Sequence, residues 1–282
     1  LDRLETFLTS TLGKGVIRAK DTPNFVANRA GVFGMMSIFL EAEKYGLRYD
    51  VVDDLTGAKL GRAKSATFRT ADVVGLDTMM HVIRTMTDNL PADKDPFAAC
   101  YTIPPVLKAL VDKGALGQKT KAGFYRKEGK AIKVVDPKLG DYVDSGGKAD
   151  ELIVRILKTK NVGERLKLLR ETDHPQAKFL WAIFRDAFHY IAIHLETIAD
   201  SARDIDFALR WGFGWKTGPF ETWQAAGWKQ VAEWVQDDID RGEALCKAPL
   251  PKWVFTGPVA KAGGVHTPEG SWSAAAKKFV GR

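Results

Sequence analysis

The chain has 282 residues, of which 45% are hydrophobic and 27% are charged. This composition excludes a largely disordered protein and is long enough for two compact units. The net charge of +7 suits an anionic partner, either a phosphorylated cofactor or a nucleic acid, and charge alone does not choose between them. The two cysteines lack metal-ligand spacing, and no apolar segment near residue 1 resembles a secretory signal, so we expect a reducing, cytoplasmic location.

The first twenty residues predict a helix followed by a short strand. Apolar side chains recur at helical spacing, and a glycine separates them from two β-branched residues: Leu4, Phe7, Leu8, Leu12, Gly13, Val16 and Ile17. A strand needs partners for its backbone hydrogen bonds, and the nearby sequence supplies no parallel set. We therefore interpret residues 1–20 as the end of a domain whose earlier part lies outside this chain.

The most apolar stretch of the chain predicts a central helix. Thr22 and Pro23 form a helix-start signal, so we expect the helix to begin near Pro23. Between Ala30 and Leu40 only Ser37 is polar, a pattern typical of an enclosed helix. The stretch is well short of the roughly 20 residues that span a bilayer. Two glycines within it, at positions 31 and 34, each weaken a helix by about 1 kcal/mol, which indicates close packing.

The remainder of the first part predicts short helices and one hairpin. We expect a helix ending near Gly57, a loop from Gly61 to Phe68, a helix from Thr70 with a break at Gly75, and a helix over 103–113. Gly129 predicts the turn of a β-hairpin between residues 124–126 and 131–135. Residues 136–147 are polar and loop-like, and their final glycines mark the predicted domain boundary.

The second part predicts further helices, over 149–157, 162–170, 177–199, 201–212 and 228–241. In the longest of them, Arg185, Asp186 and His189 are expected on the polar face. The segment 249–282 is rich in Pro, Gly, Lys and Ala, and we interpret it as a linker.

An internal repeat connects the two parts. The stretch from Asp53 to Gly61 aligns with Asp206 to Gly214, and after a one-residue gap Phe68 aligns with Phe220. We therefore predict a mainly α fold with two tandem helical domains related by duplication, an N-terminal helix-strand remnant and a small β-hairpin. The predicted boundaries are 1–20, 21–147, 148–248 and the linker 249–282.

The sequence offers few catalytic patterns. No catalytic triad and no metal site is recognisable, and the glycines 212, 214 and 218 follow a helix with the wrong spacing for a nucleotide fingerprint. Asn28 stands out as an amide one turn inside a helix that is about to become fully apolar, where it needs hydrogen-bond partners if it is enclosed. A structural amide and a functional amide are both compatible with this pattern. Lys119 lies in a basic loop before the hairpin, where a solvated lysine is the simpler interpretation.

Three motifs together resemble the C-terminal helical region of NAD-dependent 3-hydroxyacyl-CoA dehydrogenases. They are Asp21-Thr-Pro-Asn-Phe-Val-Ala-Asn28-Arg29, then Gly61 to Asp77 with its Val-Gly-Leu-Asp ending, and Lys119-Thr-Lys-Ala-Gly-Phe-Tyr125. The second part resembles the repeated helical domain of longer family members, including multifunctional fatty-acid oxidation proteins. The first loop departs from the family, because Ser65-Ala-Thr-Phe68 stands where Gly-Pro-Phe-Glu is usual, whereas residues 218–221 keep that motif.

The resemblance implies the role of the chain and of three residues. In this family a Rossmann domain precedes the helical domains, and a His-Glu pair in that domain acts as base while NAD accepts a hydride from 3-hydroxyacyl-CoA. Neither the glycine fingerprint nor the His motif occurs here, so the resemblance implies a substrate-binding and packing region of the β-oxidation enzyme that is inactive alone. Asn28 and Trp211 match substrate-contacting positions, and Lys119 matches a lysine that reaches the cofactor. Arg62 and Lys64 add positive charge that could attract a phosphate-bearing cofactor.

The implied partners are 3-hydroxyacyl-CoA, the chain's own Rossmann domain and, where present, a further C-terminal domain. Nucleic acid and a membrane span are not expected. A noncatalytic helical dimerisation or assembly module is the alternative, and nucleic-acid binding by the basic loops is a third hypothesis, which requires a steep salt dependence.

Overall fold

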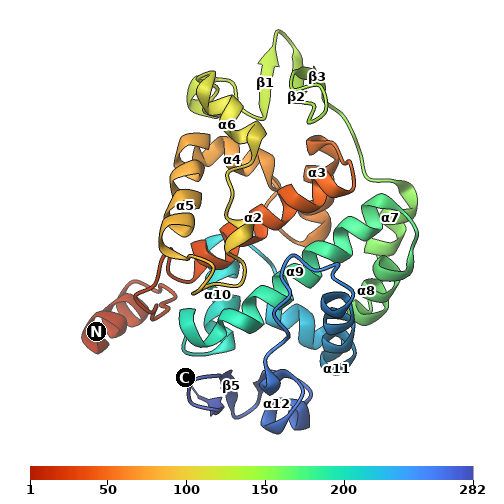
Figure 1. Ribbon diagram of the computed structural model, residues 1–282. Helices are drawn as coiled ribbons and strands as arrows, with labels where there is room; N and C mark the ends of the chain where they lie inside the picture. Colours follow the sequence, from red (N-terminus) through yellow and green to blue (C-terminus); the bar gives the residue numbers. More distant parts are fainter. Residues whose placement is uncertain (282) are drawn as a thin grey trace.

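Two long helices cross at the centre of the molecule (Figure 1). The structure is a computed structural model that describes residues 1–281. Helix α2 (Ala27–Lys44) packs against helix α9 (Pro175–Ile198), and Phe33 of α2 stacks on Tyr190 of α9 with ring centroids 3.8 Å apart. Both helices are buried over most of their surface, as their apolar sequences predict. The mainly α fold class is therefore confirmed.

Short helices and a small antiparallel sheet complete the first half. The sheet has the strand order β1-β2-β3 and projects from the body beside α6 (Figure 1). The elements are α1 (Asp2–Thr6), a π-helical turn (Phe7–Thr11), α3 (Tyr49–Thr56), 3-10 turns at Ala58–Leu60, Ala98–Cys100 and Gln118–Thr120, α4 (Phe68–Val74), α5 (Leu76–Asn89), α6 (Pro105–Asp112), β1 (Tyr125–Glu128), β2 (Ala131–Val135) and β3 (Tyr142–Asp144). The hairpin and the break at Gly75 are confirmed, whereas β3 lies in a segment that we expected to be loop.

The second half surrounds α9 with helices. These are α7 (Glu151–Leu157), α8 (Val162–Glu171), α10 (Ala202–Gly212) and α11 (Pro219–Asp240). Helix α11 starts nine residues before the predicted position and bends at Gly227, whose φ of 100° is not helical. The capping interaction of Glu221 with the backbone of Gly218 explains the earlier start, because it satisfies an N–H group that a helix leaves unpaired.

The segment after residue 248 is folded, which corrects its interpretation as a linker. It contains a 3-10 turn (Lys252–Val254), α12 (Gly257–Ala262) and a second antiparallel sheet of β4 (His266–Thr267), β5 (Gly270–Ser273) and β6 (Lys278–Val280). The indole of Trp228 in α11 donates to the carbonyl of Val254, and Val259, Val265 and Trp272 are buried. These scattered apolar residues anchor the segment, although its average composition resembles that of a linker.

The N-terminal segment differs from its prediction at the strand. Residues 12–20 form no strand, because no neighbouring strand is available to pair with Val16 and Ile17. Leu4 and Phe7 in the helical turns, and Leu12 just after them, are half exposed or more. In Figure 1 this segment projects from the body, so its apolar side chains lie largely outside the core.

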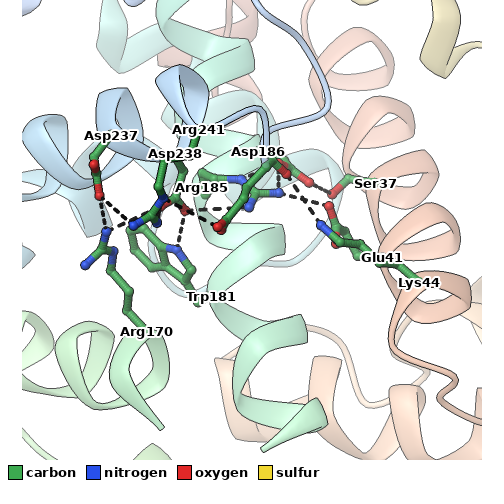
Figure 2. Close-up of polar contacts among 11 residues, drawn as sticks. Ser37, Glu41, Lys44, Arg170, Trp181, Arg185, Asp186, Asp237, Asp238 and Arg241 are labelled. Atoms are coloured by element: carbon green, nitrogen blue, oxygen red, sulfur yellow. Dashed lines mark hydrogen bonds and ion pairs between the residues drawn. The ribbon is translucent and has the colours of Figure 1, made fainter. Parts of the chain in front are cut away.

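A buried charge network joins α2, α9 and α11 (Figure 2). The guanidinium of Arg185 lies 2.8 Å from an oxygen of Asp186, 2.9 Å from one of Glu41 and 3.6 Å from one of Asp238. Ser37 donates to Asp186, and Trp181 donates to Asp238. The expectation that Arg185, Asp186 and also His189 lie on a solvated face is wrong, since all three are buried. Arg185 and Asp186 are buried with polar or charged partners from α2 and α11, and His189 with the backbone carbonyl of Ala248, so the burial is compensated by contacts that are distant in sequence.

Glu41 makes the stability of this network depend on pH. Burial, with the nearby charge of Asp186, raises the pKa of Glu41 from 4.5 to about 7. The folded protein therefore keeps a proton that the unfolded chain loses, and this contribution to stability is full below about pH 4.5 and is lost as the pH rises through about 7. We expect Glu41→Gln to flatten the pH profile of the unfolding free energy by about 3 kcal/mol between about pH 5 and pH 8. Urea titrations of both proteins measure the two profiles, and parallel profiles would contradict the assignment.

Aligned residues of the two halves make similar backbone hydrogen bonds and have similar backbone angles. Asp53 accepts hydrogen bonds from the backbone N–H groups of Thr67, Phe68 and Arg69 at the start of α4. Asp206 accepts them from the N–H groups of residues 220 and 221 at the start of α11. The glycines that break these helices, at positions 75 and 227, have φ values of 101° and 100°. The duplication itself stays a prediction, and this agreement supports it.

Within the described residues, no helix is long and apolar enough to cross a bilayer. The same residues contain no cluster of three or more His, Cys, Asp or Glu side chains arranged to hold a metal ion.

Candidate functional site

A cavity of about 390 Å³ lies where the two halves meet. Helix α2 forms one wall, the loop before α4 and α4 itself form the second, and the end of α10 with the following loop forms the third. The lining residues are Asn28, Gly31, Gly34, Met35, Ile38, Arg62, Ala63, Ser65, Ala66, Thr67, Thr70, Val74, Gly212, Phe213 and Trp215. The lining is mainly apolar with a few polar groups, which is the usual character of a small-molecule site.

Asn28 opens into this cavity from the start of α2. The helix begins at Ala27 and not near Pro23, because Asn24 and Phe25 have positive φ values of 63° and 51° that are incompatible with a helix. Asn28 is therefore the second residue of the helix, in the first turn, and not one turn inside it. Its side chain is exposed and makes no hydrogen bond with any described residue. Its amide is free to bind a ligand.

A buried ion pair holds the helix next to Asn28 in place. The guanidinium of Arg29 donates to Asp95 at 2.9 Å and to the hydroxyl of Tyr190 at 2.7 Å. His194 of α9 lies 3.2 Å from the other oxygen of Asp95. Because these contacts join the start of α2 to α9, they fix the position of the Asn28 backbone relative to the second half.

The two glycines of α2 have different roles. A Cβ atom on Gly31 would lie 2.2 Å from the ring of Phe213, so the missing side chain admits an aromatic ring from the second half. A Cβ atom on Gly34 would meet no atom within 4 Å, because Gly34 faces open space in the cavity. The predicted packing reason therefore applies to Gly31, with a side chain as the neighbour and not a backbone.

The second wall is positioned by buried carboxylates. Besides its three backbone hydrogen bonds, Asp53 accepts one from the hydroxyl of Tyr125 at 2.9 Å. Burial raises the pKa of Asp53 to about 6. Asp72 accepts hydrogen bonds from the N–H groups of Phe124 and Tyr125, which attach the hairpin to α4. Asp53 therefore fixes the end of the loop that carries Arg62 and Ser65.

Trp211 lies beside the cavity and outside its lining. Its indole is 48% exposed and stacks on Phe207 with centroids 4.6 Å apart. A Cβ atom on Gly15 would lie 2.3 Å from this indole, so the segment after α1 packs directly against it. Its neighbours Gly212 and Phe213 line the cavity instead. Contact between Trp211 and a substrate therefore stays a prediction.

Lys119 lies apart from Asn28 and outside the cavity. Its Nζ is 2.7 Å and 2.6 Å from the two carboxylate oxygens of Asp77, and half of its side chain is exposed. The flanking residues Gln118 and Lys121 line a larger cavity of about 600 Å³ on the hairpin side of α4. The two cavities share only Ser65, so the structure does not bring Lys119 and Asn28 into one site.

No histidine of the described residues lines the cavity with Asn28. His189 is buried with its Nε2 atom 2.7 Å from the carbonyl oxygen of Ala248, and burial lowers its pKa to about 4. His266 lies 2.8 Å from Asp206 at the start of α11. The described side chains therefore supply a polar contact for a ligand but no general base at this position.

The described residues do not form a dinucleotide site by themselves. Their two sheets are small and antiparallel, and neither feeds a glycine-rich turn into a helix. The glycines 212, 214 and 218 lie at the end of α10 and in the loop after it, which agrees with the rejection of that pattern as a nucleotide fingerprint.

Sequence reasoning missed Phe213 and Trp215 as parts of the cavity. The signal was present in the aromatic residues between glycines 212 and 218, but their partner Gly31 is far away in the sequence. The fold and the cavity together define a mainly helical protein with a cavity between its two halves.

Comparison with known proteins identifies the family. Residues 25–127 match the model of the 3-hydroxyacyl-CoA dehydrogenase C-terminal domain. The chain is 39% identical over 250 residues to a Bacillus subtilis protein named "Probable 3-hydroxyacyl-CoA dehydrogenase", covering 85% of this chain and 31% of that protein. It is 30% identical over 260 residues to a Rickettsia felis protein named as a fatty acid oxidation complex trifunctional enzyme, covering 90% and 34%.

A solved structure has the same fold over most of the chain. The 3-hydroxybutyryl-CoA dehydrogenase of Escherichia coli K12 superposes with a TM-score of 0.58 at 17% identity, over 89% of this chain and 63% of that one. This likeness concerns the fold alone. The chain belongs to the 3-hydroxyacyl-CoA dehydrogenase family, and it spans about a third of the length of the Bacillus and Rickettsia relatives.

Proposed function

We propose that this chain forms the substrate-binding and closing part of an NAD-dependent 3-hydroxyacyl-CoA dehydrogenase that oxidises 3-hydroxyacyl-CoA to 3-oxoacyl-CoA in fatty-acid β-oxidation. One observation carries the proposal: the unpaired amide of Asn28 opens into an apolar cavity built by both halves. Membership of the family supports the reaction class. A cytoplasmic location is part of the same proposal.

The cavity suits one end of such a substrate. Its apolar wall, with Met35, Ile38 and Phe213, can accept hydrocarbon, and Asn28 can donate to the oxygen on C3. An amide held on a rigid helix is preorganised, so it stabilises charge that develops on this oxygen without a large rearrangement. The walls also exclude water from the reacting carbon, which favours hydride transfer over side reactions.

In this proposal, the catalytic base and most of the residues that bind NAD belong to a nucleotide-binding domain outside this chain. NAD, when bound, supplies the hydride acceptor. Lys119 is proposed to approach the cofactor after exchanging its contact with Asp77. Trp211 is proposed to touch the substrate at the cavity mouth. The exposed apolar residues of the N-terminal segment, among them Leu4 and Phe7, suit packing against the nucleotide domain.

The alternative is a noncatalytic helical assembly module. The exposed apolar N-terminal segment is the observation that favours it. An assembly module does not require an open cavity with a free amide. Substitutions that fill the cavity should therefore impair a substrate-binding protein and leave an assembly module unaffected.

Filling the cavity at Gly34 tests the proposed function. In the complete protein, we expect Gly34→Leu to raise the KM for 3-hydroxybutyryl-CoA about 30-fold, because the new side chain takes ligand space and overpacking of this kind costs about 1–3 kcal/mol. Steady-state kinetics with NAD measure the effect. Thermal unfolding shows whether the variant is folded.

Gly34→Ala is the matched control for this substitution. It removes the helix-weakening glycine and adds only one carbon, so we expect about 1 kcal/mol of added stability and a KM within about threefold of wild type. If the leucine variant is stable and keeps the wild-type KM, the cavity does not bind the substrate. Lack of dehydrogenase activity in the wild-type complete protein would refute the proposal as a whole.

A further inference from the structure

Arg62 reaches into the junction of the two halves from the loop after α3. Its guanidinium carbon lies 4.1 Å from the centre of the Trp215 ring, which belongs to the second half. The side chain is half buried and lines the cavity that contains Asn28. It also borders two small apolar recesses behind the cavity, beside Phe33 and Phe184.

Arg62 has no carboxylate partner, unlike three of the other arginines that stack on rings in this protein. Arg69 also stacks on a ring without an ion pair, but it does not line the cavity that contains Asn28. Arg126, Arg170 and Arg210 each lie over an aromatic ring and each form an ion pair with a carboxylate. Arg62 makes no ion pair and no side-chain hydrogen bond with any residue in the part of the chain that the structure describes. Burial lowers its pKa to about 10, with no acidic group to oppose the effect.

The chemistry of this arrangement indicates a ligand. A guanidinium has five N–H donors in a planar fork that matches carboxylate and phosphate groups. Stacking on Trp215 holds the plane of the fork and leaves its edge free. A partly desolvated cation without a counterion is costly in the free protein, and an anionic ligand group would offset that cost.

We propose that Arg62 binds an anionic group of the acyl-CoA ligand inside the cavity shared with Asn28. This inference rests on the proposed function. The anion is a carboxylate at the far end of the acyl chain or a phosphate of coenzyme A, and both groups present the same oxygen geometry to the guanidinium.

Three ligands distinguish the two sources of the anion. 3-Oxoadipyl-CoA carries a terminal carboxylate and the CoA phosphates, 3-oxohexanoyl-CoA carries only the phosphates, and 3-oxohexanoyl-pantetheine carries neither. Calorimetric titration of each into the complete protein gives the Kd for wild type and for Arg62→Met. We expect Kd to rise about 30-fold for each ligand that presents the recognised anion, which is the usual scale for losing a charge-assisted hydrogen bond.

The pattern across the three ligands decides the outcome. A loss confined to 3-oxoadipyl-CoA identifies the acyl carboxylate. An equal loss for both CoA esters, with none for the pantetheine ester, identifies the phosphates. The inference is overturned if all three ligands lose affinity equally, if none does, or if the wild-type protein binds none of them.

Two further variants separate binding from folding. Arg62→Gln keeps a planar polar end without the charge, so it should show the same ligand pattern even if the methionine variant unfolds. Lys113→Met removes an exposed charge just after the end of α6, outside the cavity lining, and should leave all three affinities unchanged. Dehydrogenase activity of the wild type is assayed separately. If the wild type turns over normally and the Arg62 variants bind all three ligands as tightly as the wild type, only the role of Arg62 is refuted.

Discussion

Replacing Arg185 with methionine is expected to lower the free energy of unfolding by about 4 kcal/mol, the usual cost of leaving buried charges without their partner. Its guanidinium is the cation shared by Glu41, Asp186 and Asp238, and all of these side chains are buried (Figure 2). Methionine has a similar length and fills much of the space, so the loss arises mainly from electrostatics. Urea denaturation followed by circular dichroism measures it.

An exposed arginine provides the control for this experiment. Arg18 pairs with Asp2 and Glu5 at the surface, where solvent weakens the attraction, so Arg18→Met should leave the unfolding free energy nearly unchanged. The defect of the Arg185 variant should also shrink as the pH falls below about 7, because protonation neutralises Glu41. A loss below about 1 kcal/mol at neutral pH would show that the network is dispensable.

Replacing Asn28 with alanine in the complete protein is expected to lower kcat for 3-hydroxybutyryl-CoA about 10²-fold to 10³-fold, the scale for losing one preorganised donor at a developing charge. The side chain is exposed, and no described residue depends on it for a hydrogen bond. Folding should therefore be unaffected. Because the interaction is proposed to strengthen in the transition state, kcat should fall more than KM rises.

Asn89→Ala provides the matched control. Asn89 is an exposed amide at the end of α5 that donates to the carbonyl of Thr85, away from the cavity lining. Its loss should change kcat less than twofold. If Asn28→Ala leaves kcat and KM at wild-type values, the assembly module becomes the better description of this chain.

Local patterns predicted most helices and the hairpin. The apolar run of α2, the periodic face of α9 and the glycine at 129 all act through short-range rules, and each element is present. The start of α2 was predicted wrongly, because Thr22 and Pro23 gave a valid signal that the positive φ values of Asn24 and Phe25 override. The fold of residues 249–282 depends on packing against α11, which composition does not reveal.

The candidate site was predicted only in part. The family motifs indicated Asn28, and the structure places it in a cavity, whereas Lys119 pairs with Asp77 and Trp211 lies beside the lining. The role of Arg62 depends on the absence of a carboxylate around it within the described residues. Whether a carboxylate lies near Arg62 depends on which residues the fold brings around it, so sequence spacing could not indicate it.

The sequence by itself determined the mainly helical class, the central apolar helices and the family. These features follow from hydrophobic periodicity, turn residues and motifs that operate over short separations. Only the tertiary structure decided which polar residues are buried, where the cavity lies and which ring meets Gly31. Those outcomes depend on contacts between residues more than a hundred positions apart, such as Ser37 with Asp186 and Arg62 with Trp215. Desolvation and pairing of polar groups are set by such contacts, because a side chain is buried by its neighbours in space.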